Sequence, residues 1–328
     1  GIPIYRDIGV HRVQDLPRKP WKRTGGNGTF IQLLGTEGLW GGYVVEVPGG
    51  ILNSIGLPNE GIDHLIGVTL PRMRGRCAAL MVNVAGERVP EFEDIAEKLA
   101  AAQRAQPGDF QAVELNLSCP NVESGFPFAK SPELARDCVR RVRRHLELPV
   151  FAKLSPNVAD IVEIAQACRD GGADGFTLVN TALGMALDWK SGRAKLGGGH
   201  GGFSGPGLRS QAVYLIHAAY KATGLPIIGA GGVETAEDVM EMLAAGAQAV
   251  QVGTATFRNP FALREMLARL PALLDLAGAK SPGEHTGLAV RVVHHRPRLR
   301  VRRQCRHRVR LRAAAQRQRP RARRPRRH

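Results

Sequence analysis

Residues 111–121 read QAVELNLSCPN, an apolar strand that runs directly into a polar loop. At the junction lie two carboxamides, Asn116 and Asn121, with the hydroxyl of Ser118 and the thiol of Cys119. A thiol in such a place can act as a base or a nucleophile, and flanking amides can bind a planar, hydrogen-bonding ligand. The alternative is a buried strand end whose polar groups only cap a turn. Polar ends on other strands favour a functional site.

On both sides of this stretch the chain alternates short apolar strands with amphipathic helices. The expected strands are 77–84, 111–117, 149–154, 174–179, 225–230 and 247–252. The expected helices are 89–105, 131–146, 158–170, 208–223, 235–245 and 260–277, with N-caps near Ser131, Asp160 and Thr235 and helix ends at Gly171, Gly172, Gly224 and Gly246. Apolar strands that are each followed by a helix predict a parallel sheet covered by helices.

Polar residues or glycines follow the predicted strands at their carboxyl ends. They are Asn83, Asn116, Lys153, Asn180, Gly231 and Gly253. A (β/α)8 barrel places its active site at this end, so we predict an α/β fold of the TIM-barrel type. The alternative is an open doubly wound sheet, but its usual glycine-rich fingerprint is not found near the start. Residues 1–45 do not continue the pattern, so the first two barrel strands are not recognisable, and 39–47 reads as a hairpin or a strand.

Charge divides the chain into unlike parts. The 328 residues carry a formal net charge of +17, yet 17 arginines and no acidic residue lie in 291–328, which leaves the rest formally neutral. We predict a divergent or non-native segment at 1–45, a barrel domain at 46–285 and a disordered arginine-rich tail at 286–328. The tail would bind nucleic acid only non-specifically, and we favour a non-native extension as its origin.

The cysteines and the hydropathy pattern bear on the compartment. Cys77, Cys119, Cys138, Cys168 and Cys305 are scattered, without the spacing of a zinc or iron–sulfur site. We therefore predict a reducing cytoplasm, with Cys138 and Cys168 as buried helix residues. No apolar run is long enough to span a membrane, and no basic-then-apolar leader opens the sequence.

Two further features indicate an anionic ligand. Gly231-Gly232 and Gly253-Thr254 end the last two predicted strands, where bare backbone amides beside helix N-termini form an anion cradle. The alternative is that these glycines only permit tight turns. Lys153 lies on an otherwise apolar strand and needs a negative partner. That partner is either a ligand that gains negative charge or Glu114 on the neighbouring strand.

A set of ordered motifs resembles dihydroorotate dehydrogenase over about residues 46 to 285. The motifs are ILNSIGLPN (51–59), NVAG (83–86), ELNLSCPN (114–121), FAKLSPN (151–157), VNT (179–181), GFSGP (202–206), IGAGGV (228–233) and VGTA (252–255). The resemblance is greatest to the class 1 enzymes with a cysteine base, type 1B, and NTALGM (180–185) points the same way.

The resemblance implies a cofactor, a reaction and partners. It implies that FMN oxidises (S)-dihydroorotate to orotate, with Cys119 as the base and hydride transfer to flavin N5. The implied FMN contacts are Asn83, Asn116, Lys153, Val179, Gly205, Gly231, Gly232, Gly253 and Thr254, and the implied substrate contacts are Asn53, Ser54, Gly56, Leu57, Asn121, Asn180 and Thr181. It also implies a homodimer, and a partner subunit that carries FAD and a [2Fe-2S] cluster and passes electrons to NAD.

The chain departs from the family at its N-terminal side. The family carries a lysine upstream of the 51–56 segment, but only Lys19 and Lys22 precede Asn53, and Thr29 occupies the position expected by spacing. Two other functions stay open on the sequence alone. One is a dihydropyrimidine dehydrogenase-like flavoenzyme, and the other is an inactive barrel that binds nucleic acid through its arginine tail.

Overall fold

The computed structural model describes residues 8–10, 43–55, 60–76, 79–86, 88–118, 128 and 131–292. The chain divides into a compact unit, Gly1–Arg291, and a second unit, Val292–His328. All the elements described below begin in the first unit. Among the described residues, no helix is both long and apolar enough to cross a membrane.

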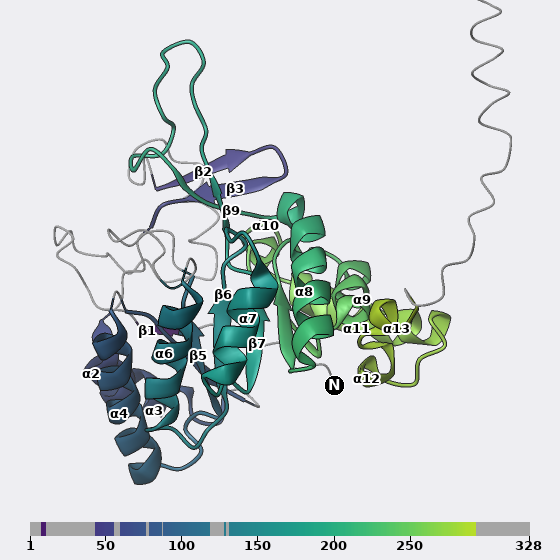
Figure 1. Cartoon of the computed structure of the whole chain (residues 1–328). Helices are drawn as coiled ribbons and strands as arrows, with labels where there is room; N and C mark the ends of the chain where they lie inside the picture. The colour runs from purple at the N-terminus through teal and green to yellow at the C-terminus, as the bar shows by residue number, and fades with distance from the viewer. Residues whose placement is uncertain are drawn as a thin grey trace, which may run out of the picture. The chain divides into compact units, whose positions relative to one another are not determined.

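A sheet of parallel strands forms the centre of this unit (Figure 1). In spatial order its strands are β1 (Ile8–Val10), β4 (Met81–Val84), β5 (Ala112–Asn116), β6 (Val150–Leu154), β7 (Gly175–Leu178), β10 (Ile227–Ala230) and β11 (Ala249–Gln251). Chain order and spatial order agree throughout, as expected when each strand is followed by a helix that returns the chain to the next strand. This is the architecture of a (β/α)8 TIM-type barrel, and all six predicted strands are confirmed.

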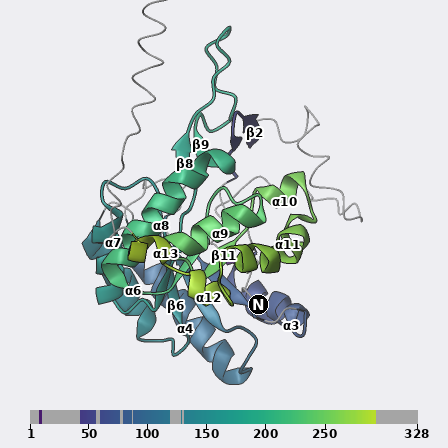
Figure 2. The ribbon, with the colours of Figure 1, turned by 90° about the vertical axis from the view of Figure 1, so that its right-hand side faces the viewer.

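Helices cover the outer face of the sheet. They are α4 (Val89–Ala105), α6 (Pro132–Arg143), α7 (Ile161–Asp170), α8 (Arg209–Thr223), α9 (Ala236–Ala245) and α11 (Ala262–Leu276). Figure 2 shows α8, α9 and α11 on this outer layer, where α9 packs against both of the others. Their buried faces and the outer faces of the strands form the main hydrophobic core. All six predicted helices are confirmed.

The helix ends confirm the predicted caps. Ser131 and Asp160 accept hydrogen bonds from the backbone amides of Leu134 and Val162. Thr235 and Asp238 bond reciprocally in a capping box at the start of α9. Gly224, which ends α8, has φ +67°, a left-handed conformation that side chains other than glycine's rarely adopt.

Shorter helices complete the unit. Before β4 come α2 (Gly61–His64), a π-helical turn (Leu65–Thr69) and α3 (Leu70–Met73). After β9 (Gly201–Ser204) come the 3-10 turn η2 (Pro206–Leu208), then α10 (Ala255–Arg258), α12 (Pro282–His285) and α13 (Leu288–Val292) further along the chain. Thr286 is buried and donates to the carbonyl of Ala247 over 3.1 Å, so the packed chain continues past residue 285.

A second, antiparallel sheet lies at the carboxyl ends of the barrel strands (Figure 1). Its order is β2 (Val44–Val47), β3 (Gly50–Asn53), β9 (Gly201–Ser204) and β8 (Ala182–Gly184). In the segment 39–47, where a hairpin or a strand was expected, the described residues form the single strand β2, which makes a hairpin with β3 beyond that segment. β8 and β9 belong to an excursion between β7 and α8, so the end of β7 leads the chain directly into this sheet.

The N-terminal part differs in one respect from the sequence expectation. β1 falls within residues 1–45, where no strand pattern is visible, and pairs in parallel with β4. Among the described residues, β11 and β1 are not hydrogen-bonded to each other, so the sheet is not closed between these two strands. The proposed division at 1–45, 46–285 and 286–328 stays a prediction.

Inside the barrel the strands present an apolar layer and then a polar layer. Met81, Ile228 and Ala249 form a small core of their own, with Ala112 and Phe151 packed against it. Because side chains alternate across a strand, residues two positions further on face the same way. On four of these five strands the next residue on that face is polar, namely Asn83, Glu114, Lys153 and Gln251.

Candidate active site

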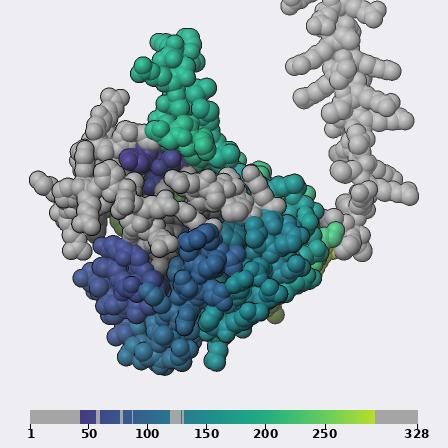
Figure 3. Space-filling view, turned by 60° about the vertical axis from the view of Figure 1, so that its left-hand side comes forward, coloured from purple at the N-terminus to yellow at the C-terminus, as the bar shows by residue number. Residues whose placement is uncertain are grey.

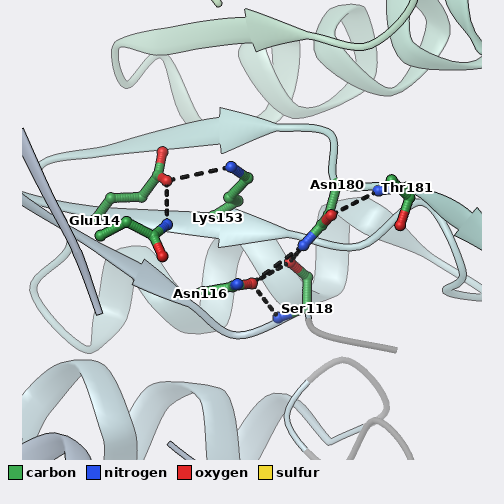
Figure 4. Close-up of polar contacts among 7 residues, drawn as sticks. Glu114, Asn116, Ser118, Lys153, Asn180 and Thr181 are labelled. Atoms are coloured by element: carbon green, nitrogen blue, oxygen red, sulfur yellow. Dashed lines mark hydrogen bonds and ion pairs between the residues drawn. The ribbon is translucent and has the colours of Figure 1, made fainter. Parts of the chain in front are cut away.

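The first feature at the carboxyl end of the barrel is a network of amides and hydroxyls. Asn180, which follows β7, donates through Nδ2 to Asn116 Oδ1 over 3.1 Å and to Ser118 Oγ over 2.8 Å. Ser118 Oγ donates in turn to Asn116 Oδ1 over 3.0 Å. Figure 4 shows the three side chains pointing toward one another from the ends of β5 and β7. Asn116 and Ser118 are buried, so the network holds these polar groups in fixed positions.

The network continues into the antiparallel sheet through Asn157. Its Nδ2 donates to the carbonyl of Thr181 over 3.0 Å, and its Oδ1 accepts from the amide of Leu183 over 2.7 Å. The Oδ1 of Asn180 accepts from the amide of Thr181 over 2.8 Å. Asn157 therefore positions the start of β8 relative to Asn180.

Asn53 and Thr181 converge on β9. Asn53 Nδ2 donates to the carbonyl of Gly202 over 3.2 Å. A Cβ atom on Gly202 would lie 2.2 Å from Thr181 Oγ1, and one on Gly201 would lie 2.2 Å from the carbonyl oxygen of Asn53. Only glycine allows this close approach, which brings residues 53 and 181 to one strand. Ser54 lies nearby, since a Cβ on Gly198 would be 2.7 Å from its Oγ.

A glycine cradle lies beyond the ends of β9, β10 and β11. Gly205, Gly231 and Gly232 have φ of +114°, +113° and +78°. A Cβ on Gly232 would lie 2.8 Å from the carbonyl oxygen of Gly205 and from the amide nitrogen of Arg209, so these two loops touch. No atom of the described residues would lie within 4 Å of a Cβ on Gly253. The described residues therefore leave room beside this backbone for an anion.

Two further contacts join the cradle to its neighbours. Thr254 Oγ1 donates to Ser204 Oγ over 2.9 Å, which links the end of β11 to β9. Val179 is buried, its amide donates to the carbonyl of Ala230 over 2.8 Å, and a Cβ on Gly231 would lie 3.3 Å from its Cγ2. Val179 therefore packs between the amide network and the cradle.

Lys153 lies between these two regions and forms an ion pair. Its Nζ is 3.4 Å from Glu114 Oε2 (Figure 4). The same Oε2 also accepts from Asn83 Nδ2 over 2.5 Å. The ion pair with Glu114, one of the two partners that the sequence left open, is thus present. The Lys153 side chain is 12% exposed whereas Glu114 is fully buried. The carboxylate therefore lies deeper than the ammonium group.

Several predicted site residues lie outside the described part of the chain. They are Cys119, Asn121, Gly56 and Leu57, together with Thr29 at the expected position of the family lysine. The two described cysteines, Cys138 and Cys168, are free and buried on α6 and α7, as predicted. Burial raises the pKa of the Cys168 thiol to about 12 and raises that of Cys138 well above its usual value, so both stay protonated thiols.

Sequence reasoning named Ser118 at the strand–loop junction but assigned it no contact, and it gave Asn157 no role of its own. Ser118 accepts from Asn180, and Asn157 contacts Thr181 and Leu183, so both belong to the network. Among the described residues, no cluster of histidine, cysteine or acidic side chains could hold a metal ion.

These features define a class of protein: a TIM-type barrel whose carboxyl end offers an anion cradle, a lysine and an array of amide groups. A family profile for dihydroorotate dehydrogenase matches residues 37–274. The chain therefore belongs to the dihydroorotate dehydrogenase family, whose members depend on flavin.

Individual relatives agree with this assignment. The chain is 46% identical over 236 residues to a "Dihydroorotate dehydrogenase B (NAD(+)), catalytic subunit" of Bacillus cereus (strain G9842), covering 72% of this chain and 75% of that protein. A protein of the same name from Bacillus anthracis (strain CDC 684) is 45% identical with the same coverage.

Two solved structures of dihydroorotate dehydrogenase (DHODH) have a similar fold. Eimeria tenella DHODH in complex with ferulenol has a TM-score of 0.61 and 25% identity, with 74% of this chain and 72% of that chain covered. The ligand-free enzyme of the same organism has a TM-score of 0.65 and 22% identity, with 78% and 77% covered.

Proposed function

We propose that this protein is the catalytic subunit of an NAD-linked dihydroorotate dehydrogenase, which oxidises (S)-dihydroorotate to orotate in the de novo synthesis of UMP. The observation that carries the proposal is the amide network of Asn116, Ser118 and Asn180 at the carboxyl end of the barrel. Amides donate and accept hydrogen bonds, as the ring edge of a pyrimidine requires. The identity of 46% to a B-type catalytic subunit supports the same reaction.

FMN is the cofactor we assign to the glycine cradle and the barrel interior. Its phosphate would be held by the backbone at Gly205, Gly231, Gly232 and Gly253 and by the hydroxyl of Thr254, while Asn83, Asn116, Lys153 and Val179 would contact the ring. The positive-φ glycines, the room that the described residues leave at Gly253 and the cation of Lys153 fit an anionic group with a ring beside it. When bound, flavin supplies the acceptor for the hydride that leaves the substrate.

The protein's own groups bind the substrate and remove its proton. Cys119 takes the proton from ring carbon five, and a thiol with an ordinary pKa of about 8.5 needs activation or basic pH to do so. The carboxylate and ring amides of dihydroorotate are bound by Asn53, Ser54, Gly56, Leu57, Asn121, Asn180 and Thr181. Of these, Asn53, Ser54, Asn180 and Thr181 lie around β3, β8 and β9.

Electrons must leave this chain through a partner. No cysteine spacing for an iron–sulfur cluster exists in the sequence, so we assign FAD and a [2Fe-2S] cluster to a separate subunit that reduces NAD. The name of the Bacillus relatives, an NAD(+) enzyme with a catalytic subunit, supports a second subunit. The free, buried cysteines Cys138 and Cys168 are consistent with a reducing cytoplasm.

We also assign a homodimer to the catalytic subunit. The connection between β8 and β9 extends away from the barrel (Figure 3) and exposes every second residue from Leu183 to Trp189. Leu183 is 49% exposed and Trp189 is 85% exposed, with Met185 and Leu187 between them. A continuous apolar face on an edge strand is a typical protein contact, and a second copy would cover it.

The proposed substrate is tested by anaerobic reduction of the purified flavoprotein. We expect dihydroorotate to bleach the flavin absorbance and dihydrouracil to bleach it at least about 100-fold more slowly, because dihydrouracil lacks the carboxylate. Faster bleaching by dihydrouracil would instead support a dihydropyrimidine dehydrogenase-like enzyme.

A further inference from the structure

Glu114 is a buried acid to which the proposed reaction gives no role. It is fully buried on the inner face of β5. Its Oε2 accepts from both Asn83 and Lys153, whereas its Oε1 has no hydrogen-bond partner among the described residues. A buried carboxylate with a free oxygen is costly to fold, so its presence calls for an explanation.

The polar layer around Glu114 has other incomplete members. Thr177 Oγ1 on β7 and Gln251 Nε2 on β11 are also buried without partners in the described part of the chain. Thr177 lies opposite Lys153 in the β6–β7 register. Three strands therefore place unsatisfied polar atoms inside the barrel, beyond its apolar layer. These atoms fit a site that is completed by a polar ligand or by water.

We propose that Glu114 is a positioning residue that holds Lys153 and Asn83 toward the cofactor and sets the reduction potential of the flavin. This inference rests on the proposed function. The carboxylate lies behind the ammonium group, since Glu114 is fully buried and the Lys153 side chain is partly exposed. Glu114 thus fixes the place of the cation from within the barrel.

The charge of Glu114 also opposes that of Lys153. A flavin gains negative charge on reduction, and a nearby ammonium group stabilises that charge. The carboxylate offsets part of this stabilisation, because the two opposite charges lie 3.4 Å apart in a buried environment. Removing the carboxylate charge makes the surroundings of the flavin more positive, so the reduced form becomes more stable.

The test is the midpoint potential of the FMN-loaded Glu114→Gln variant, measured by anaerobic reductive titration against a reference dye. We expect the potential to become more positive by about 30 mV or more, which corresponds to a tenfold change in a two-electron equilibrium. Glu114→Asp retains the charge and should keep the wild-type potential. Asp174→Asn is the matched control, because Asp174 precedes β7 at the amino end of the barrel and bonds to the amide of Val150.

Each outcome decides the inference. A flavin-loaded Glu114→Gln protein with the wild-type potential would overturn it. If Glu114→Gln binds no flavin, Glu114→Asp decides: flavin binding at the wild-type potential supports the role of the charge, and failure to bind refutes it. A wild-type protein that takes up no FMN would contradict the proposed function itself and the inference with it.

Discussion

At the scale of single residues, the side chains that we propose to bind the substrate differ from the one that we propose as the base. The amides of Asn116 and Asn180 are fixed by mutual hydrogen bonds, whereas Cys119 follows directly after this network in the sequence. Binding and proton removal can therefore be tested by separate substitutions.

Replacement of Cys119 by alanine should leave FMN bound and slow the reduction by dihydroorotate by about 10²- to 10⁴-fold, because the general base is lost. Anaerobic stopped-flow absorbance measures this rate. The control is Cys138→Ala, which removes a buried, protonated thiol from α6. The flavin of this variant should be reduced by dihydroorotate at the wild-type rate. Fast reduction of the Cys119→Ala protein would rule out the cysteine as base.

Replacement of Asn180 by alanine should weaken substrate binding and leave the flavin bound. The change leaves the buried Ser118 Oγ without the donor of Asn180, while Asn116 Oδ1 still accepts from Ser118, and we expect substrate binding to weaken by about 1–3 kcal/mol. We expect KM for dihydroorotate to rise about tenfold or more, measured in steady-state assays. An unchanged KM would show that Asn180 supports only the loop.

Some residues of the candidate site could be predicted from the sequence and others could not. Asn116, Lys153 and Asn180 were predictable because each is a polar residue at the end of an apolar strand. Asn157 was not, because asparagine after a proline is typical of a turn, and its bond to the amide of Leu183 depends on an excursion far along the chain. The pairing of Lys153 with Glu114 was left open, since neighbouring strands and a ligand can each supply a negative charge.

At the scale of elements, the glycines that end strands and helices differ in what they must accommodate. Gly232 has φ +78° and no room for a Cβ, while Gly278, after α11, has φ +68° and no described residue within 4 Å of a Cβ. Alanine substitutions at these two glycines therefore separate the loss of stability caused by backbone strain from the loss of FMN binding caused by a side chain in the cradle.

Gly232→Ala should lower the free energy of unfolding by roughly 1–3 kcal/mol and weaken FMN binding at least about tenfold. Gly278→Ala carries only the backbone strain, so it should destabilise by about 1 kcal/mol and keep the wild-type FMN affinity. Urea unfolding and titration of the apoprotein with FMN give the two quantities. Equal FMN affinities of the two variants would show that the cradle is not part of the cofactor site.

The parallel strands and covering helices were predictable because their periodicity and caps are local. The antiparallel sheet was only partly predictable. β3 pairs with β9 about 150 residues later, as in the bond from Asn53 to Gly202, and nothing in either strand alone specifies that partner. β1 was missed for a similar reason, since three residues carry no usable period.

At the scale of the whole molecule, the apolar face of the β8–β9 connection predicts self-association. The double substitution Met185→Asp and Leu187→Asp should convert a dimer into a monomer, because it places charges in a desolvated contact. Light scattering after size-exclusion chromatography measures the mass. Leu276→Asp, at an 84% exposed position on α11, is the control and should stay dimeric. A monomeric wild type would contradict the homodimer.

The arginine-rich tail should be separable from the enzyme. Deletion of residues 293–328 should leave FMN content and melting temperature unchanged, since Thr286 and α13 stay in place. The full chain should bind RNA weakly in low salt and lose this binding as salt rises, because phosphate contacts release counterions. Binding that survives the deletion would place the nucleic-acid contact on the barrel.

The most direct test of the central claim is the visible spectrum of the purified full chain before and after anaerobic addition of dihydroorotate. The account predicts a yellow protein with about one FMN per chain whose absorbance bleaches on addition. That result would join the glycine cradle, the amide network and the proposed substrate in one working site. A colourless protein, or a yellow protein that dihydroorotate does not bleach, would contradict the account.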